Sequence, residues 1–141
     1  MRRIKATVSL MICLSLATSC DYCKFMYGEE DLGSRFTLVN ENKDRIYILY
    51  CTSETCCSSG LHIIPSKVVG SMFDERWIIA KSVEKNKVNS DYWIIDKQSA
   101  VNLDNCKNNC DSVVKANIFG PFDYSEFSNQ KKLLGIGLDL E

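Results

Sequence analysis

The amino-acid sequence predicts an α+β fold, in which an antiparallel β-meander sheet of about six strands carries a C-terminal helix, after a cleaved signal peptide. Three observations predict this fold. Between residues 35 and 97, short runs of β-forming apolar residues alternate with polar turns, which is typical of antiparallel strands. Residues 122–135 carry the start and stop signals of one helix. Removing residues 1–19 from the 141-residue chain leaves 122 residues, the size of one domain with a single core.

The first 19 residues have the three parts of a secretory signal peptide. Three basic residues among the first five precede an apolar run over residues 8–17, which is too short to cross a bilayer as a permanent helix. Small residues lie directly before Cys20, as in the lipobox of bacterial lipoproteins, although Ala17 stands where many lipoboxes carry Leu. We therefore expect acylation of Cys20, with chains such as palmitate, and a stable anchor on a membrane of the cell envelope.

Two alternatives remain open for this leader. The tripeptide at residues 17–19 also fits the A-x-A-like site of the ordinary signal peptidase, and Cys20 would then be the first residue of a soluble secreted protein. The leader could also stay uncleaved as an N-terminal anchor, which its short apolar run disfavours.

The chain divides into a lipoprotein signal peptide (residues 1–19), a lipid-anchored tether (20–30) and a single globular domain (31–141). Its composition is that of an ordinary globular protein, with 45% hydrophobic and 25% charged residues. Without the three basic residues of the leader, 14 Lys and Arg stand against 18 Asp and Glu, a net charge of −4. Because no clustered positive charge is visible, nucleic acid is not expected as a partner.

The first half of the domain is expected to form short strands at residues 35–39, 45–50, 61–64 and 67–72. The polar residues 40–44 form a turn, and residues 52–60, rich in Ser and Thr, form a loop. Residues 45–50 are bulky β-formers throughout, so this strand is expected in the centre of the sheet. Pro65 cannot donate a hydrogen bond to a neighbouring strand and so marks a bend or a bulge.

Two segments then repeat the pattern acid-x-Trp-Ile-Ile-x-Lys, sixteen residues apart, at 75–81 and 91–97. We interpret them as neighbouring strands of a hairpin, each with its Trp on one face and a lysine closing the edge. Residues 83–90 would form the solvated loop between them. The alternative interpretation is a duplicated binding motif, in which Trp77 and Trp93 act as a pair.

A helix near the C-terminus has signals at both of its ends. Asp123 and Glu126 stand three apart as a capping box, and Phe122 and Phe127 occupy the flanking staple positions. Two lysines in the last turn and Gly135 directly after it are typical of a helix C-terminus.

This helix, residues 124–134, is expected to bury Phe127 and Leu134, two turns apart on one face, against the sheet. The earlier segment 99–115 stays open between two structures. A weak apolar stripe favours a helix, whereas the Asn- and Asp-rich run at 102–109 favours a loop.

Apart from Cys13 in the leader and the acylated Cys20, six cysteines remain: Cys23, Cys51, Cys56, Cys57, Cys106 and Cys110. An even number in an exported chain favours disulfides, whose pairing the sequence leaves open. The adjacent Cys56 and Cys57 would form a strained ring with each other, so each is expected to pair elsewhere or stay reduced.

Alternatively, Cys51, Cys56 or Cys57, Cys106 and Cys110 could hold a zinc ion through four thiolates. Their spacings, C-x4-C-C and C-x3-C, are not the short C-x2-C knuckles typical of zinc sites. Structural disulfides are therefore favoured, and no metal or other cofactor is expected.

Several segments together carry a resemblance to a known family: IPSKVV at 64–69, FDERWIIAK at 73–81, YWIIDK at 92–97, FGPF at 119–122 and Phe127. Their content and order resemble an uncharacterised family of small lipoproteins of Gram-negative bacteria, classed only as a domain of unknown function. The similarity covers most of residues 31–136. The resemblance implies export, a lipid anchor and a compact domain of sheet and helix, and it implies no activity.

Catalytic patterns are absent from the sequence. His62, the only histidine, stands in an apolar segment, and no G-x-S-x-G turn or Gly-rich phosphate loop occurs. Carboxylate pairs such as Asp74 with Glu75, or Asp96 with Glu75, are more typical of solvated turns than of glycosidase sites. We therefore expect a protein that is not an enzyme.

Two hypotheses for the function follow. The favoured one is a non-catalytic, lipid-anchored envelope lipoprotein that binds or scaffolds an unknown envelope protein or glycan, with Trp77, Trp93 and Tyr92 as the possible binding surface. The alternative is a cysteine-based metal or thiol-redox protein of the envelope. A weaker third idea is an inhibitor of a cell-wall hydrolase.

The leader predicts how two cysteine variants will differ. Cys20→Ser removes the acceptor of the lipid, so this variant is expected to leave the membrane fraction of the producing cells or to keep its uncleaved leader. Cys23→Ser is the matched control and is expected to stay in the membrane fraction with an acylated mass. Intact mass spectrometry of both fractions measures the difference, and a membrane-bound, cleaved Cys20→Ser protein would contradict acylation.

Overall fold

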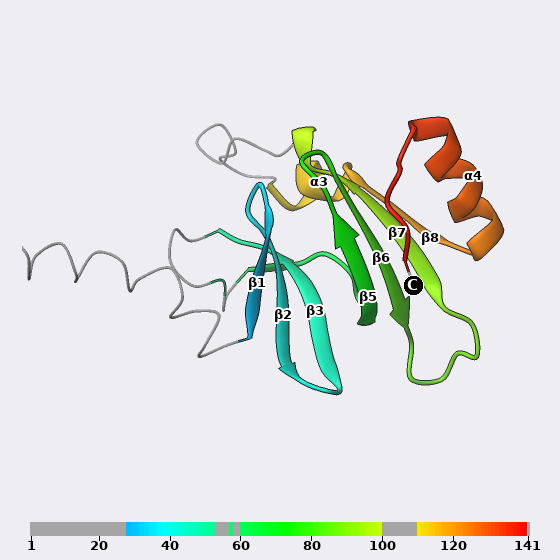
Figure 1. Ribbon diagram of the computed structural model, residues 1–141. Helices are drawn as coiled ribbons and strands as arrows, with labels where there is room; N and C mark the ends of the chain where they lie inside the picture. Colours follow the sequence, from blue (N-terminus) through cyan, green and yellow to red (C-terminus); the bar gives the residue numbers. More distant parts are fainter. Residues whose placement is uncertain (1–27, 53–56, 58–59, 100–109, 141) are drawn as a thin grey trace, which may run out of the picture.

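The computed structural model describes residues 28–52, 57, 60–99 and 110–140 (Figure 1). Within these residues the strands form two four-stranded antiparallel sheets. The first sheet has the order β1 (Glu29–Gly33), β2 (Phe36–Asn42), β3 (Arg45–Tyr50), β4 (Leu61–His62). The second has the order β5 (Lys67–Phe73), β6 (Trp77–Val83), β7 (Asp91–Asp96), β8 (Ile118–Phe122). The described helical segments are the 3-10 turn η1 (Lys97–Ser99), α3 (Cys110–Lys115) and α4 (Tyr124–Leu134).

The mostly antiparallel sheet structure with a C-terminal helix agrees with the predicted class, but the strands form two sheets rather than one sheet of about six. The break falls at Pro65, between β4 and β5, where the sequence predicts a bend. β4 is only two residues long, and a proline cannot donate to a ladder, so strand pairing does not continue from one sheet into the other.

Two strands lie where the sequence predicts none. β1 begins at Glu29, so Glu29 and Glu30, the last residues of the expected tether, already pair with Val39 and Leu38 of β2. β8 contains the Gly120–Pro121 step, whose peptide bond is cis. Acidic residues in β1 and a Gly-Pro step in β8 are poor strand signals, and tertiary pairing outweighs them here.

The main core lies between the two sheets. In the first sheet Phe36 pairs with Tyr50, and their rings meet edge to face with centroids 5.1 Å apart. In the second sheet the inward row includes Ile78, paired with Ile95. These four side chains are at most 1% exposed and belong to one apolar cluster, so the two sheets share a single core.

The opposite face of the second sheet is covered by α4 and by the chain that follows it. Figure 1 shows α4 on the side of β7 and β8 that faces away from the first sheet. Phe127 is 3% exposed and packs with Ile79, Ile94 and Ile136. β6 and β7 are therefore buried on both faces, which explains their nearly continuous apolar sequence.

The ends of α4 have the predicted caps. The Asp123 carboxylate accepts the Glu126 N–H at 2.9 Å, and the Glu126 carboxylate accepts the Asp123 N–H at 3.3 Å, which completes the capping box. Gly135 adopts the left-handed conformation with φ of 67°, and the Ile136 N–H then bonds the Lys131 carbonyl at 2.9 Å.

Leu134, in contrast, is 40% exposed, so the expectation that it packs on the sheet is wrong. Gly135 turns the chain directly after Leu134, and Ile136 of the following segment occupies the buried position instead.

The two tryptophans lie on opposite faces of the second sheet. Residues that pair directly across an antiparallel ladder share a face, and Trp77 pairs with Asp96, three positions from Trp93. Because three is odd, Trp93 points to the other face. Trp77 therefore joins the cluster under α4, and Trp93 joins the core between the sheets.

Lys97 connects the two sheets instead of closing a solvated edge. It follows β7 directly, is 4% exposed, and donates its ammonium to the Leu32 carbonyl of β1 at 2.6 Å. The ammonium also lies 5.2 Å from the centre of the Phe73 ring. A Cβ atom at Gly33 would come within 3.0 Å of this nitrogen, so glycine leaves the room that Lys97 needs.

Burial lowers the pKa of Lys97, and the nearby carboxylates of Asp74, Asp31 and Glu75 oppose this shift only in part.

Phe127 and Leu134 form a matched pair for testing how α4 is attached. Phe127→Ala should lower the free energy of unfolding by about 3–5 kcal/mol, because it removes a buried ring and leaves a cavity. Leu134→Ala should change it by less than about 1 kcal/mol, because the side chain is partly exposed. Urea denaturation followed by circular dichroism measures both, and equal losses would contradict the packing described.

The buried Lys97 predicts a pH dependence of stability. Its pKa is lower in the folded than in the unfolded state, so the unfolded chain binds more protons between the two pKa values. The contribution of Lys97 to the free energy of unfolding therefore rises as the pH increases through this window toward about 10.4. Lys97→Met, which keeps the apolar stem, should remove this rise.

Lys132→Met, at an exposed position of α4, is the control and should keep the rise. Urea denaturation of the three proteins at a series of alkaline pH values measures the difference. Parallel profiles for Lys97→Met and the unmutated protein would contradict a buried, charged Lys97.

Candidate binding pocket

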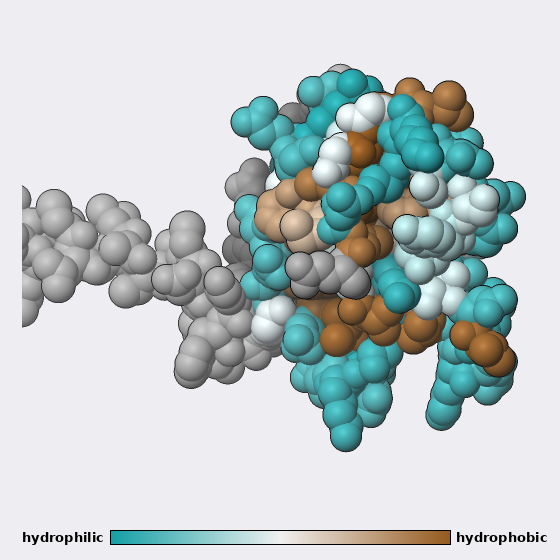
Figure 2. All heavy atoms as spheres, turned by 45° about the vertical axis from the view of Figure 1, so that its right-hand side comes forward, coloured by the Kyte–Doolittle hydropathy of each residue, from teal (hydrophilic) through white to brown (hydrophobic). Residues whose placement is uncertain are grey.

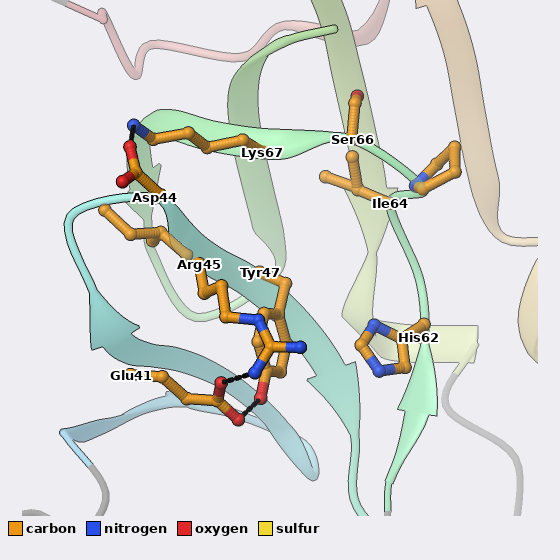
Figure 3. A pocket seen from close by; sticks show the side chains of 10 residues that line it. Glu41, Asp44, Arg45, Tyr47, His62, Ile64, Ser66 and Lys67 are labelled. Carbon is orange, nitrogen blue, oxygen red and sulfur yellow. Dashed lines mark hydrogen bonds and ion pairs between the residues drawn. The ribbon is translucent and has the colours of Figure 1, made fainter. Parts of the chain in front are cut away.

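The larger of the two described pockets opens between the β2–β3 hairpin and the connection from β4 to β5, with a volume of about 410 Å³ (Figure 3). Its lining residues come from β2, β3, the turn between them, β4, the β4–β5 connection and the start of β5. They are Glu41, Asp44, Arg45, Ile46, Tyr47, His62, Ile64, Pro65, Ser66 and Lys67.

On the hairpin side of the pocket, Glu41 is hydrogen-bonded to two neighbouring side chains. The pairing of β2 with β3 passes from Asn40–Ile46 to Asn42–Arg45, so Glu41 is the extra residue of a bulge. Its carboxylate accepts a hydrogen bond from the Arg45 guanidinium at 3.1 Å and another from the Tyr47 hydroxyl. Figure 3 shows both donors converging on this one carboxylate.

Tyr47 and His62 provide the aromatic part of the lining. His62 pairs with Leu49 across β3 and β4, and Tyr47 lies two residues from Leu49 on the same face, so the rings are diagonal neighbours. Their centroids are 4.7 Å apart at an interplanar angle of 37°. Burial, and then the Glu41 carboxylate, raises the pKa of Tyr47 to about 12. The phenol therefore stays protonated at neutral pH and acts as a donor.

On the other side of the pocket, the Lys67 ammonium lies 3.8 Å from the Asp44 carboxylate. The Ser66 hydroxyl donates to Ser82 at 2.8 Å. Ile46 and Ile64 belong to the main core or pack against it, and they give the pocket an apolar part. Two acidic and two basic side chains thus line the pocket, each acid beside a base.

A second, smaller pocket of about 150 Å³ lies beside α4. Tyr92 and Phe127 stack there with ring centroids 5.0 Å apart, and the Lys131 ammonium bonds Asp139 at 2.5 Å. Lys81 also lines it, with its ammonium 5.9 Å from the centre of the Tyr92 ring.

Apolar side chains also reach the surface along β5, one of the two edge strands of the second sheet. Val69, Met72 and Phe73 are between 40% and 47% exposed. Figure 2, which brings the right-hand side of Figure 1 forward, shows apolar atoms near the centre of that face with hydrophilic side chains around them.

The structure does not bring Trp77, Trp93 and Tyr92 together into one surface. Trp77 is 7% and Trp93 is 6% exposed, on opposite faces of the sheet. Trp93 donates its indole N–H to the Ser82 hydroxyl at 2.8 Å within the core. Tyr92 alone lines a pocket, the smaller one beside α4.

The cysteines of the described residues form one disulfide, between Cys51 and Cys57, with Cα atoms 5.1 Å apart. Both residues are buried against Val39 and Leu49 on the outer face of the first sheet. The Cys57 N–H donates to the buried Glu29 carboxylate at 3.0 Å and 3.2 Å to its two oxygens. Thus a carboxylate of β1 and the disulfide together hold Cys57 against the first sheet.

Sulfurs joined in a disulfide are not thiolates, so Cys51 and Cys57 in this form are unavailable to the zinc set considered above. Cys20, Cys23, Cys56 and Cys106 lie outside the described residues, as does the side chain of Cys110 at the start of α3. In the part of the chain that the structure describes, no three His, Cys, Asp or Glu side chains gather in a way that could hold a metal ion.

The carboxylates considered as a catalytic pair have structural partners instead. Asp74 accepts the backbone N–H groups of Arg76 and Trp77 at 2.8 Å and 2.7 Å, which fixes the turn between β5 and β6. Asp96 forms an ion pair with Arg76 at 3.1 Å.

Most of the pocket is not evident from the sequence. Glu41 and Asp44 belong to a predicted turn, and Arg45 and Lys67 are the first residues of predicted strands. The prediction of His62 as a strand residue is correct, and it is exposed. Glu41, Arg45 and Tyr47 form a cluster that has one sequence signal. The signal is an acid and a base four residues apart, followed two residues later by a tyrosine.

The chain matches a known protein family over most of its length. Residues 33–141 match the model of a family described as "Protein of unknown function (DUF3997)". No curated protein and no solved structure matches the chain. Among the helices of the described residues, none has the length and apolar character that crossing a membrane requires.

The burial of Tyr47, together with its hydrogen bond to Glu41, predicts an unusually high pKa for its hydroxyl. Above about pH 10 the unfolded chain loses the Tyr47 proton that the folded chain keeps up to about pH 12, so this group lowers the free energy of unfolding over that range. In Glu41→Gln the pKa of Tyr47 should fall toward 10, although burial still raises it.

The measurement is the phenolate absorbance as the pH is raised, with Tyr47→Phe subtracted to isolate this residue and circular dichroism to monitor folding. A Tyr47 that titrates near pH 10 with the other tyrosines in the folded protein would contradict the geometry described.

Proposed function

We propose that this chain, which belongs to the DUF3997 family of proteins of unknown function, is a non-catalytic, lipid-anchored binding module of the bacterial cell envelope. The observation that carries the proposal is the pocket between the β2–β3 hairpin and the β4–β5 connection. Its ligand is held there while the acyl chains on Cys20 keep the domain at a membrane surface.

The size and position of the pocket support binding. A volume of about 410 Å³ lies within the range of about 300–1,000 Å³ that is typical of small-molecule sites. β2 and β3 pair with each other along the pocket, at Asn40–Ile46 and Asn42–Arg45. Side chains mounted on such strands lose little freedom when a ligand binds, which favours affinity.

The contacts among the lining residues also support binding rather than catalysis. Glu41 is engaged by two donors and Asp44 lies beside Lys67. The Ser66 hydroxyl is bonded to Ser82, and Tyr47 holds its proton to about pH 12. These contacts occupy the Glu41 carboxylate and the Ser66 and Tyr47 hydroxyls, which favours a binding role.

The leader supports the envelope location. A basic start, a short apolar run and small residues before Cys20 are the parts of a lipoprotein signal. The Cys51–Cys57 disulfide fits an oxidising compartment outside the cytoplasm.

The experiment is crosslinking inside the producing cells, with a photoreactive amino acid at Lys43. This exposed residue lies in the turn beside Asp44, at the rim of the pocket, and does not line it. The matched control is the same substitution at Lys132, on the exposed surface of α4. We expect a discrete adduct of any chemical class at Lys43 and none at Lys132.

Adding Arg45→Ala to the Lys43 protein should weaken the adduct, because Arg45 lines the pocket. No adduct at Lys43, or equal adducts at both positions, would contradict the proposed binding site.

A further inference from the structure

We infer that the ligand of this pocket is an uncharged saccharide, whose hydroxyls bond the Glu41–Arg45 pair and whose C–H groups pack on the apolar part of the lining. The inference rests on the proposed function, because it assumes that the pocket binds a ligand, and it names the chemical class of that ligand.

The charge balance of the pocket favours an uncharged ligand. Glu41 lies 3.1 Å from Arg45, and Asp44 lies 3.8 Å from Lys67. An anion would have to compete with the two carboxylates for the bases, and a cation would have to compete with the two bases for the carboxylates. An uncharged polar ligand leaves both pairs in place and uses the hydrogen-bonding capacity that they keep.

The hydrogen-bond acceptors of Glu41 and donors of Arg45 that are still unused match the hydroxyl groups of a sugar. A carboxylate offers about four acceptor positions, and Arg45 and Tyr47 use two of those on Glu41. A guanidinium has five N–H donors, and the bond to Glu41 uses one from Arg45. Acceptors and donors therefore lie side by side. Neighbouring sugar hydroxyls, each both donor and acceptor, fit such a pair.

The rest of the lining suits the C–H face of a sugar ring. Ile46 and Pro65 supply aliphatic surface, and the rings of Tyr47 and His62 lie next to each other on the strands. In Figure 3 Glu41 lies to one side of Tyr47 and His62 to the other, and the Arg45 guanidinium is seen across the Tyr47 ring. The pocket is thus polar along the hairpin and partly apolar toward β4.

The experiment is a titration of the isotope-labelled protein, followed by the NMR shifts of its backbone amides. The neutral probes are maltotriose and N,N′,N″-triacetylchitotriose. The comparison probes are glucuronate, inorganic phosphate and triglycine. We expect a neutral saccharide to produce saturable shifts at residues 41–47 and 62–67, and the comparison probes to produce none there.

Arg45→Gln should weaken the binding of the saccharide about tenfold or more, as expected for the loss of a charge-assisted hydrogen bond. Its side chain is 71% exposed, so the variant is expected to fold. Lys132→Gln on α4 is the control and should bind like the unmutated protein.

Saturable binding of glucuronate, phosphate or triglycine in the pocket, without binding of either saccharide, would overturn the inference. So would the absence of pocket shifts with both saccharides at concentrations well above about 1 mM. The crosslink at Lys43 distinguishes a failure of the saccharide inference from a failure of the proposed function. If Lys43 crosslinks to a molecule that is not a saccharide, the saccharide inference is wrong and the proposed binding site stands. If Lys43 forms no crosslink, both the inference and the proposed function are wrong.

Discussion

The structure depends on the burial of β6 and β7 on both of their faces. Ile78 and Ile95 face the first sheet, while Ile79 and Ile94 face α4, and all four side chains have no exposed surface. One sheet can satisfy both faces only if a layer covers each of them, which requires the first sheet on one side and α4 with the segment after it on the other. Burial of both faces of β6 and β7 therefore requires a structure of three layers.

The first sheet is fixed to this central layer by more than apolar contact. Lys97 reaches from the end of β7 to the Leu32 carbonyl of β1, so a buried charge joins the layers through one hydrogen bond. The disulfide and the buried Glu29 hold the outer face of the same sheet. With both faces held, β2 and β3 are a firm base for the hairpin that carries the proposed binding pocket.

Sequence reasoning found the elements whose signals are local. The Trp-Ile-Ile strands and the capped helix are all present, because periodicity and capping depend on neighbouring residues. The predictions that depend on the pairing register of neighbouring strands are wrong. The two tryptophans were expected on one face, but an odd offset across the ladder separates them. Likewise, Glu41 lines the pocket because it is the extra residue of a β-bulge, which the amino-acid composition does not predict. Ile136, after the turn at Gly135, is buried where Leu134 was expected.

The central claim is that the pocket is occupied by a ligand at the envelope. The most direct measurement is hydrogen–deuterium exchange of the domain in isolated native membranes, compared with the same domain purified in detergent. The account predicts slower exchange in the membranes at residues 41–47 and 62–67, with α4 exchanging equally in both samples. Equal exchange at the pocket, or protection confined to α4 and the segment after it, would contradict the claim.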